Sequence, residues 1–143
     1  MQHTDSIIDV PKGFFRLEDF GGFGKNFGPA YGKRDDDRLI LGFRVQPHHL
    51  NHHDVCHGGA MATFADMQIM GVKDQMHNQE HSPTINLSID YIKPVFLHDW
   101  VECAVILDKE TSGMVFTRGT MFCDGQVVAR SSAIYKLIRN YPR

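Results

Sequence analysis

Cysteine is scarce in this sequence and widely spaced. The three cysteines, Cys56, Cys103 and Cys123, are an odd number, and no two of them form a CxxC pair. A disulfide framework needs pairs of cysteines, and a cysteine-built zinc site needs closely spaced thiolates. Both classes are therefore excluded. We expect reduced thiols, with Cys103 and Cys123 packed in strands.

Long apolar runs are absent, and neither sign of charge predominates. The sequence contains no apolar stretch of about 18 residues that would predict a membrane span, and its start, MQHTDSIIDV, lacks the basic and apolar regions of a secretion signal. The 15 Lys and Arg against 17 Asp and Glu give a net charge of -2. This balance argues against nucleic acid as a partner. We expect a cytoplasmic protein without membrane contact.

The remaining composition is that of an ordinary globular protein. The 143 residues, 42% of them hydrophobic and 22% charged, suit one domain with a buried core. Residues 1–38 interleave glycines with phenylalanines and tyrosines, and Pro11 and Pro29 interrupt them further. We predict an irregular wrapping segment over residues 1–38, followed by a folded domain over residues 39–143.

Hydrophobic periodicity predicts the elements of this domain. Apolar and polar residues alternate over 39–45, 84–94, 100–107, 114–123 and 126–138, which predicts strands, and Asp124-Gly125 is a strong hairpin signal. Residues 58–72 are almost wholly apolar, which predicts a buried helix. The order of a strand, a helix and four strands in a meander predicts an α+β fold. We expect its mostly antiparallel sheet to wrap around the helix.

The loop from Asn51 to Gly59 leads directly into the predicted helix. The first N–H groups of a helix have no intrahelical partner, and the helix dipole adds partial positive charge, so an oxygen with developing negative charge is stabilised there. Gly58 and Gly59 let a ligand approach the backbone closely. We expect Asn51 and His57 to hold the loop by hydrogen bonds, with direct contact to the substrate as the alternative.

Asp66 interrupts the apolar helix. Burying an unpaired carboxylate is costly, so this side chain needs either a partner or a use. One interpretation is a hydrogen bond to Thr63 or to the neighbouring backbone. The other is catalysis, because desolvation raises the pKa of a carboxyl and suits a general base, while the ionised group is also a nucleophile.

Gly58 and Asp66 are too far apart to act together within one chain. Eight positions at roughly 1.5 Å per residue separate their backbones by about 12 Å, whereas reacting groups approach to roughly 3 to 3.5 Å. A two-fold dimer with antiparallel helices brings the helix start of one chain beside the helix middle of the other. We therefore predict a composite site at a subunit interface.

The segment from Asn51 through His57-Gly58-Gly59 to Asp66 resembles the signature of the hotdog-fold thioesterases, the 4-hydroxybenzoyl-CoA thioesterase superfamily. It is most similar to the PaaI-like acyl-CoA thioesterases. The strand from Thr84 with its Ile-Asp-Tyr-Ile-Lys-Pro ending extends the resemblance, which covers roughly residues 39–138. The resemblance implies a hotdog fold, in which an antiparallel sheet wraps one long central helix. It also implies a homodimer or homotetramer that hydrolyses acyl-CoA to free acid and CoA.

The resemblance also implies roles for individual residues. The Gly58 N–H would polarise the thioester carbonyl, while Asn51 and His57 shape the loop around it. Asp66 of the opposing subunit would activate water or attack directly. The Thr84 hydroxyl would position the water, unless Thr84 is only a strand residue that faces solvent. The N-terminal segment lies outside the core signature of the family, so the acyl group is not predicted.

Three alternatives compete with this interpretation. Five of the nine histidines lie between residues 48 and 57, but adjacent pairs in one loop lack the ligand spacing of a zinc site. We expect a solvated histidine-rich loop, with no metal and no cofactor. A hotdog dehydratase also pairs a loop histidine with a helix carboxylate, although the Gly58-Gly59 helix start fits thioester polarisation better. The third alternative is a non-catalytic acyl-CoA-binding protein that acts as a sensor. The sequence shows no DNA-binding appendage that would favour this alternative.

Overall fold

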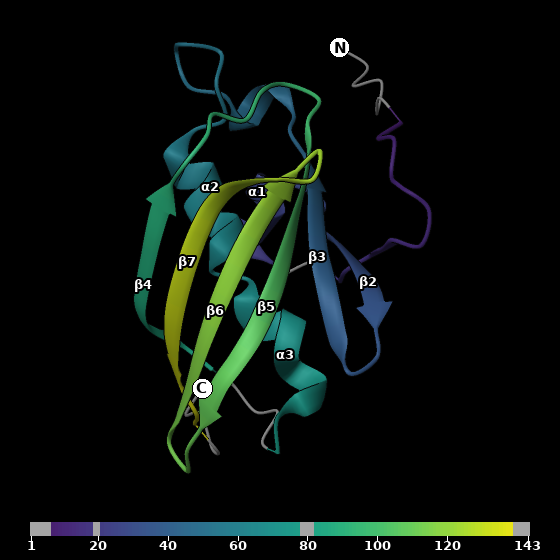
Figure 1. The fold of residues 1–143 in the computed structure, drawn as a ribbon. Helices are drawn as coiled ribbons and strands as arrows, with labels where there is room; N and C mark the ends of the chain where they lie inside the picture. The colour runs from purple at the N-terminus through teal and green to yellow at the C-terminus, as the bar shows by residue number, and fades with distance from the viewer. Residues whose placement is uncertain (1–6, 19–20, 78–81, 139–143) are drawn as a thin grey trace.

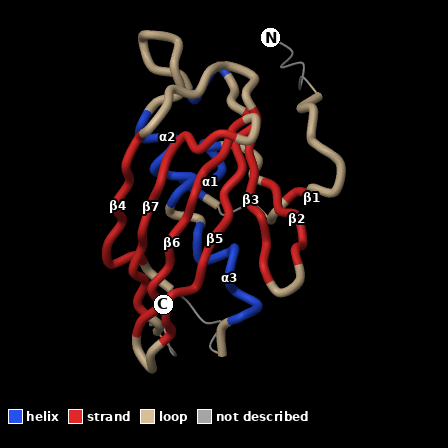
Figure 2. The backbone as a smooth tube through the Cα atoms, in the orientation of Figure 1, coloured by secondary structure: helices blue, strands red, loops and turns tan. Residues whose placement is uncertain are grey.

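The computed structural model describes residues 7–18, 21–77 and 82–138 of the chain. One antiparallel seven-stranded sheet, in the order β1-β2-β3-β5-β6-β7-β4, curves around the helices (Figure 1). Its strands are β1 (Phe15–Arg16), β2 (Tyr31–Asp35), β3 (Arg38–Arg44), β4 (Thr84–Tyr91), β5 (Trp100–Glu110), β6 (Met114–Cys123) and β7 (Gln126–Lys136). The helices lie behind the sheet in the view of Figure 2. The predicted α+β hotdog architecture is confirmed.

The helices come in short pieces. They are α1 (Gly22–Phe27), α2 (Gly58–Ala65) and α3 (Gln68–Val72), with single 3-10 turns at η1 (Pro47–His49) and η2 (Lys73–Gln75). The helix expected over residues 58–72 is present, but it is interrupted at Asp66 and Met67. The Asp66 carbonyl accepts a hydrogen bond from the Tyr135 hydroxyl at 2.8 Å, while the Met70 N–H bonds to Met67 instead. A side chain from β7 thus satisfies a carbonyl that the helix itself leaves open.

The strands between residues 84 and 136 were largely predictable, but their spatial order was not. The strands β5, β6 and β7 form a meander, but the predicted meander of four strands is wrong, because β4 does not pair with β5. Instead, β4 lies beyond β7 at the sheet edge, because the 92–99 connection carries the chain across to β5, which pairs with β3. The edge position leaves one side of the β4 backbone without a strand partner among the described residues.

The prediction of an irregular segment over residues 1–38 needs a correction for its described part. It contains β1, α1 and β2, and β2 extends the sheet by pairing Tyr31 with Gly42 and Asp35 with Arg38 of β3. A tight turn with Asp36 at φ 54° closes this hairpin. Because β2 has a glycine and charged residues in place of apolar alternation, only its pairing with β3 makes it a strand.

The core lies between the sheet and the helices. Phe27 of α1 packs on Phe43 of β3, which packs on Phe64 of α2, with ring centroids 5.1 and 4.6 Å apart. Phe43 and Phe64 are fully buried. The expected packing of Cys103 and Cys123 in strands is confirmed, since they lie in β5 and β6 as free thiols. Within the described ranges, no helix is both long and apolar enough to cross a membrane.

Candidate active site

The loop before α2 is held by the side chain of Asn51. Its Oδ1 accepts hydrogen bonds from the N–H groups of His53 and Val55 at 2.9 and 3.2 Å, and its own N–H donates to the Val55 carbonyl at 2.8 Å. These three bonds close a turn in which Asp54 adopts φ 60°. Asn51 therefore occupies the loop-supporting position that the sequence suggested.

His57 caps α2, but one N–H of the first turn has no hydrogen-bond acceptor among the described residues. Its Nδ1 accepts from the Gly59 N–H at 2.7 Å, so this nitrogen carries no proton. Its carbonyl accepts from the N–H groups of Ala60 and Met61 at 2.9 and 3.1 Å. Among the described residues, the Gly58 N–H has no such acceptor. It is thus a free donor at the positive end of a helix.

Asp66 ends α2, where the sequence had suggested the middle of one continuous helix. Its Oδ1 accepts from the Thr84 hydroxyl at 2.7 Å, so the partner is a residue of β4 and not Thr63, whose hydroxyl bonds to the Gly59 carbonyl at 2.9 Å. Burial raises the pKa of Asp66, while the Thr84 hydrogen bond acts in the opposite direction. The geometry suits a carboxylate that takes up a proton.

The structure sorts the five predicted site residues into two groups. Asn51, His57 and Gly58 lie together at the start of α2, and Asp66 and Thr84 lie together at its end. An eight-residue helix keeps these groups about 12 Å apart. Within one chain, the two groups therefore cannot act on the same carbonyl.

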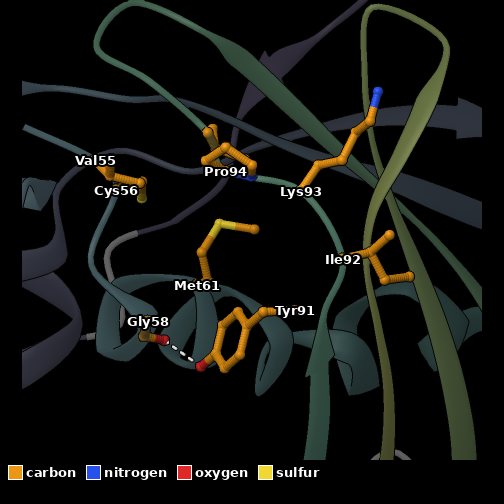
Figure 3. A pocket seen from close by; sticks show the side chains of 9 residues that line it. Val55, Cys56, Gly58, Met61, Tyr91, Ile92, Lys93 and Pro94 are labelled. Carbon is orange, nitrogen blue, oxygen red and sulfur yellow. Dashed lines mark hydrogen bonds between the residues drawn. The ribbon is translucent and has the colours of Figure 1, made fainter.

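A pocket of about 340 Å³ opens beside the start of α2 (Figure 3). Its lining is mostly apolar and includes Met61 and Pro94, with the Gly58 backbone at one side. The Tyr91 hydroxyl points at the Gly58 carbonyl oxygen, 2.6 Å away, and the Lys93 side chain extends away from it. The pocket thus offers an apolar space next to the free N–H.

Three residues that the sequence pattern did not single out as site residues fix the two ends of α2 and the start of α3. Tyr91 bonds to Gly58, Tyr135 bonds to Asp66, and Gln68 anchors the start of α3. The alternation in their strands placed the two tyrosines on apolar faces, where a hydroxyl needs a hydrogen-bond partner. This need for a partner was the sequence signal that could have identified the two tyrosines as hydrogen-bonding residues. Gln68 was visible as a polar interruption of an apolar helix.

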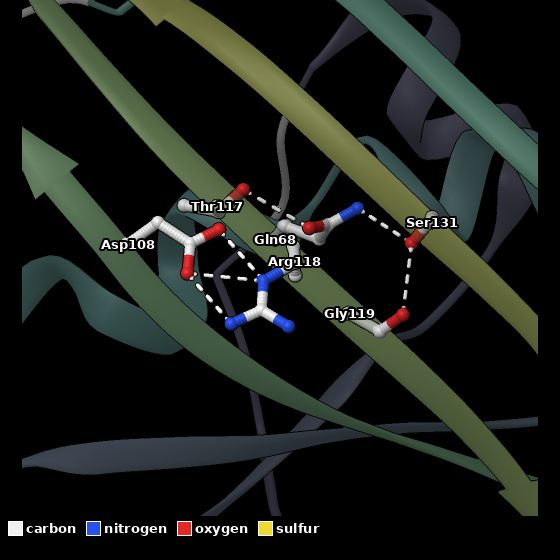
Figure 4. Close-up of polar contacts among 6 residues, drawn as sticks. All are labelled: Gln68, Asp108, Thr117, Arg118, Gly119 and Ser131. Atoms are coloured by element: carbon white, nitrogen blue, oxygen red, sulfur yellow. Dashed lines mark hydrogen bonds and ion pairs between the residues drawn. The ribbon is translucent and has the colours of Figure 1, made fainter.

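Gln68 is fully buried, and both polar atoms of its side-chain amide are hydrogen-bonded (Figure 4). Its Nε2 donates to the Ser131 hydroxyl at 2.7 Å, and its Oε1 accepts from the Thr117 hydroxyl at 3.0 Å. An added Cβ at Gly119 would meet the Gln68 side chain at 3.0 Å, so glycine leaves room for the amide. The cluster fixes α3 on β6 and β7 directly after Asp66.

The histidine-rich stretch forms separate structural contacts. His48 and His49 both bond through Nε2 to the Phe27 carbonyl, at 2.8 and 2.6 Å, and burial lowers the pKa of His49 to about 4. His52 and His53 are exposed. In the described part of the chain, the only three potential metal ligands that come together are Asp99, Cys123 and Asp124, and none of them is a histidine of this stretch.

Comparisons with known proteins agree with this architecture. A curated Pseudomonas aeruginosa protein named "Putative esterase PA0474" is 27% identical over 134 residues, which cover 92% of this chain and 99% of that protein. The Escherichia coli PaaI protein of the phenylacetic acid degradation operon superposes with a TM-score of 0.68 at 18% identity, covering 78% of this chain and 85% of PaaI.

A hypothetical thioesterase of Streptococcus pneumoniae, solved with coenzyme A, superposes with a TM-score of 0.68 at 17% identity, covering 87% of this chain and 94% of that one. These two structural likenesses show the hotdog fold. The family model described as "Thioesterase superfamily" matches residues 53–130, which contain α2, β4 and most of the meander. The chain therefore belongs to the thioesterase superfamily.

Proposed function

We propose that this protein is an acyl-CoA thioesterase that hydrolyses an acyl-CoA to a free acid and CoA. The observation that carries the proposal is the free Gly58 N–H at the start of α2, beside an apolar pocket. A donor at this place stabilises the negative charge that a thioester oxygen gains during attack. The coenzyme A bound to the similar Streptococcus pneumoniae protein supports CoA as the leaving group.

In the proposed reaction, the thioester carbonyl lies on the Gly58 N–H of one subunit, within the loop shaped by Asn51 and His57. Asp66 of the partner subunit accepts a proton from a water molecule, and the Thr84 hydroxyl beside that carboxylate positions the water. The water oxygen bonds to the carbonyl carbon. The tetrahedral intermediate then expels the CoA sulfur, which takes up the proton from Asp66, so the carboxylate is restored. Direct attack by the carboxylate is the alternative first step.

The sheet edge supports the subunit pairing that this reaction needs. The β4 backbone has no strand partner on its outer side among the described residues, and Ile85 and Tyr91 expose 53% and 54% of their surface beside α2. An edge strand with exposed apolar side chains is a typical pairing surface. Two copies that pair here around a two-fold axis bring the start of one α2 towards the end of the other.

The test is hydrolysis of a panel of acyl-CoA substrates with short, medium, long and aromatic acyl groups, by wild type and by Asp66→Asn. The reaction is followed by thioester absorbance, which reports loss of the thioester bond directly and is independent of the free thiols of the protein. We expect turnover by wild type and a loss of at least about 100-fold in the variant with its assembly intact. No turnover on any member would favour a hotdog dehydratase or a non-catalytic acyl-CoA-binding protein.

The oligomeric state, the cellular location and the absence of a metal or cofactor are predictions that need experiments of their own. Size-exclusion chromatography with light scattering will decide between a homodimer and a homotetramer built as a dimer of dimers. The cytoplasmic location needs a fractionation experiment. A hydrolysis assay after dialysis against a chelator tests the expectation that the reaction uses neither a metal nor a cofactor, because it predicts unchanged turnover.

A further inference from the structure

Tyr91 contacts Gly58 but has no part in the proposed reaction. It is the last residue of β4, and its ring lines the pocket beside α2 (Figure 3). Its hydroxyl donates to the Gly58 carbonyl oxygen at 2.6 Å. Although 54% of the residue is exposed, the hydroxyl is directed at a backbone carbonyl of the first helical turn.

The peptide group between Gly58 and Gly59 is bonded at both of its polar ends. Its carbonyl oxygen accepts from Tyr91, and its N–H donates to Nδ1 of His57 at 2.7 Å. A peptide group is planar, so two bonds at opposite ends fix the orientation of the whole plane. Tyr91 and His57 therefore act on one rigid unit from two sides.

This unit needs external support because it joins two glycines. Glycine has the least restricted backbone, and two in a row make the first turn of α2 its least constrained part. Glycine at position 58 is also what lets the tyrosine approach, since an added Cβ would meet the Tyr91 hydroxyl oxygen at 3.2 Å. The close approach and the extra flexibility thus have the same origin.

We infer that Tyr91 is a positioning residue: with His57, its hydroxyl fixes the Gly58–Gly59 peptide and so keeps the Gly58 N–H directed at the bound carbonyl. The N–H belongs to the preceding peptide, whose carbonyl is already held by Ala60 and Met61. The His57–Gly58 and Gly58–Gly59 peptide planes can still rotate relative to each other about the φ and ψ bonds of Gly58. The hydrogen bond from Tyr91 restricts this rotation. The catalytic consequence rests on the proposed function, whereas the clamp on the peptide does not.

The kinetic test compares Tyr91→Phe with wild type on the best substrate of the panel. The variant keeps the ring and loses only the hydroxyl. We expect kcat to fall about 10-fold with KM within about twofold, which is less than the 10²–10³-fold loss typical for complete removal of an oxyanion donor. Tyr31→Phe is the matched control, because no hydrogen bond from that buried tyrosine is found among the described residues. A rise in KM at unchanged kcat would overturn the inference, since Tyr91 would then only contact substrate.

A second measurement does not depend on activity. In protein labelled with ¹⁵N-glycine, solvent exchange of the Gly59 amide is measured by NMR, with its signal identified in Gly59→Ala. We expect exchange at least about fivefold faster in Tyr91→Phe, while the Gly119 amide inside β6 keeps its rate. Unchanged Gly59 exchange would refute the clamp. If wild type hydrolyses no thioester, the proposed function fails, and this measurement still decides about the clamp.

A double-mutant cycle tests whether the two side chains act on the same unit. If they do, Tyr91→Phe combined with His57→Ala loses less kcat than the product of the two single losses, because either substitution already frees the peptide. Fully multiplicative losses would mean that Tyr91 acts independently of the peptide that His57 holds, and would overturn the inference.

Discussion

Two inactive variants of this protein should restore activity when they are combined. Gly58→Pro removes the N–H at the start of α2, and Asp66→Asn removes the carboxylate at its end. Proline is favoured at the first position of a helix, and His57 before it already has the extended backbone, with ψ 137°, that a residue before proline adopts. The substitution should therefore delete a donor without breaking the helix.

The expected activity follows from the geometry of the composite site. Each site takes the Gly58 end from one subunit and the Asp66 end from the other, so both homodimers have a defect in every site. Random exchange of subunits makes about half of the dimers mixed, each with one intact and one doubly defective site, so we expect about a quarter of wild-type activity. A site within one chain would give no recovery at all.

The assay unfolds the two variants, refolds them separately or as an equal mixture, and follows thioester absorbance. Each variant refolded alone gives the baseline, and mass spectrometry confirms the mixed dimers. Gly58→Ala is the matched control for crowding, because it adds a Cβ against Tyr91 but keeps the N–H. We expect it to keep far more activity than Gly58→Pro. Mixed dimers without recovered activity would refute the composite site.

Other predictions concern the carboxylate and the buried amide. Because burial raises the pKa of Asp66, the acid limb of the pH–rate profile should lie above about pH 4. Thr84→Ala should move this limb to higher pH, since the lost hydrogen bond favours the ionised form, and Thr84→Ser should leave it in place. Because the pKa of Asp66 is raised in the folded state, the ionised carboxylate destabilises the fold once the pH rises above this pKa. Asn carries no charge, so Asp66→Asn should have a higher Tm than wild type near pH 7 but not at about pH 3. Gln68→Leu leaves the hydroxyls of Thr117 and Ser131 without their amide partner, and should cost about 2 kcal/mol and lower Tm by about 6 °C in calorimetry. An unchanged Tm would contradict this.

Much of the sheet was predictable because local signals bracket its strands. β6 has the expected bounds, since a turn precedes Met114 and Asp124-Gly125 follows Cys123. The partner of Asp66 was not predictable, because Thr84 is 18 positions away and only the packing of β4 against α2 brings the two together. The same holds for Tyr135, whose bond to Asp66 spans 69 positions and marks where the helix breaks. Patterns show which residues need a partner, and the topology decides which partner they find.

The break after α2 has an electrostatic consequence. Because the helix ends at Asp66, the carboxylate lies at the negative end of the α2 dipole, where carbonyl groups make ionisation less favourable and the anion a stronger base. The opposite end of the same helix favours negative charge at Gly58. In the proposed antiparallel pair, the C-terminal end of one α2 makes the Asp66 carboxylate a stronger base. The N-terminal end of the partner α2 stabilises the negative charge that forms on the carbonyl oxygen during attack. A single continuous helix through residue 72 would place Asp66 in its interior and lose this alignment.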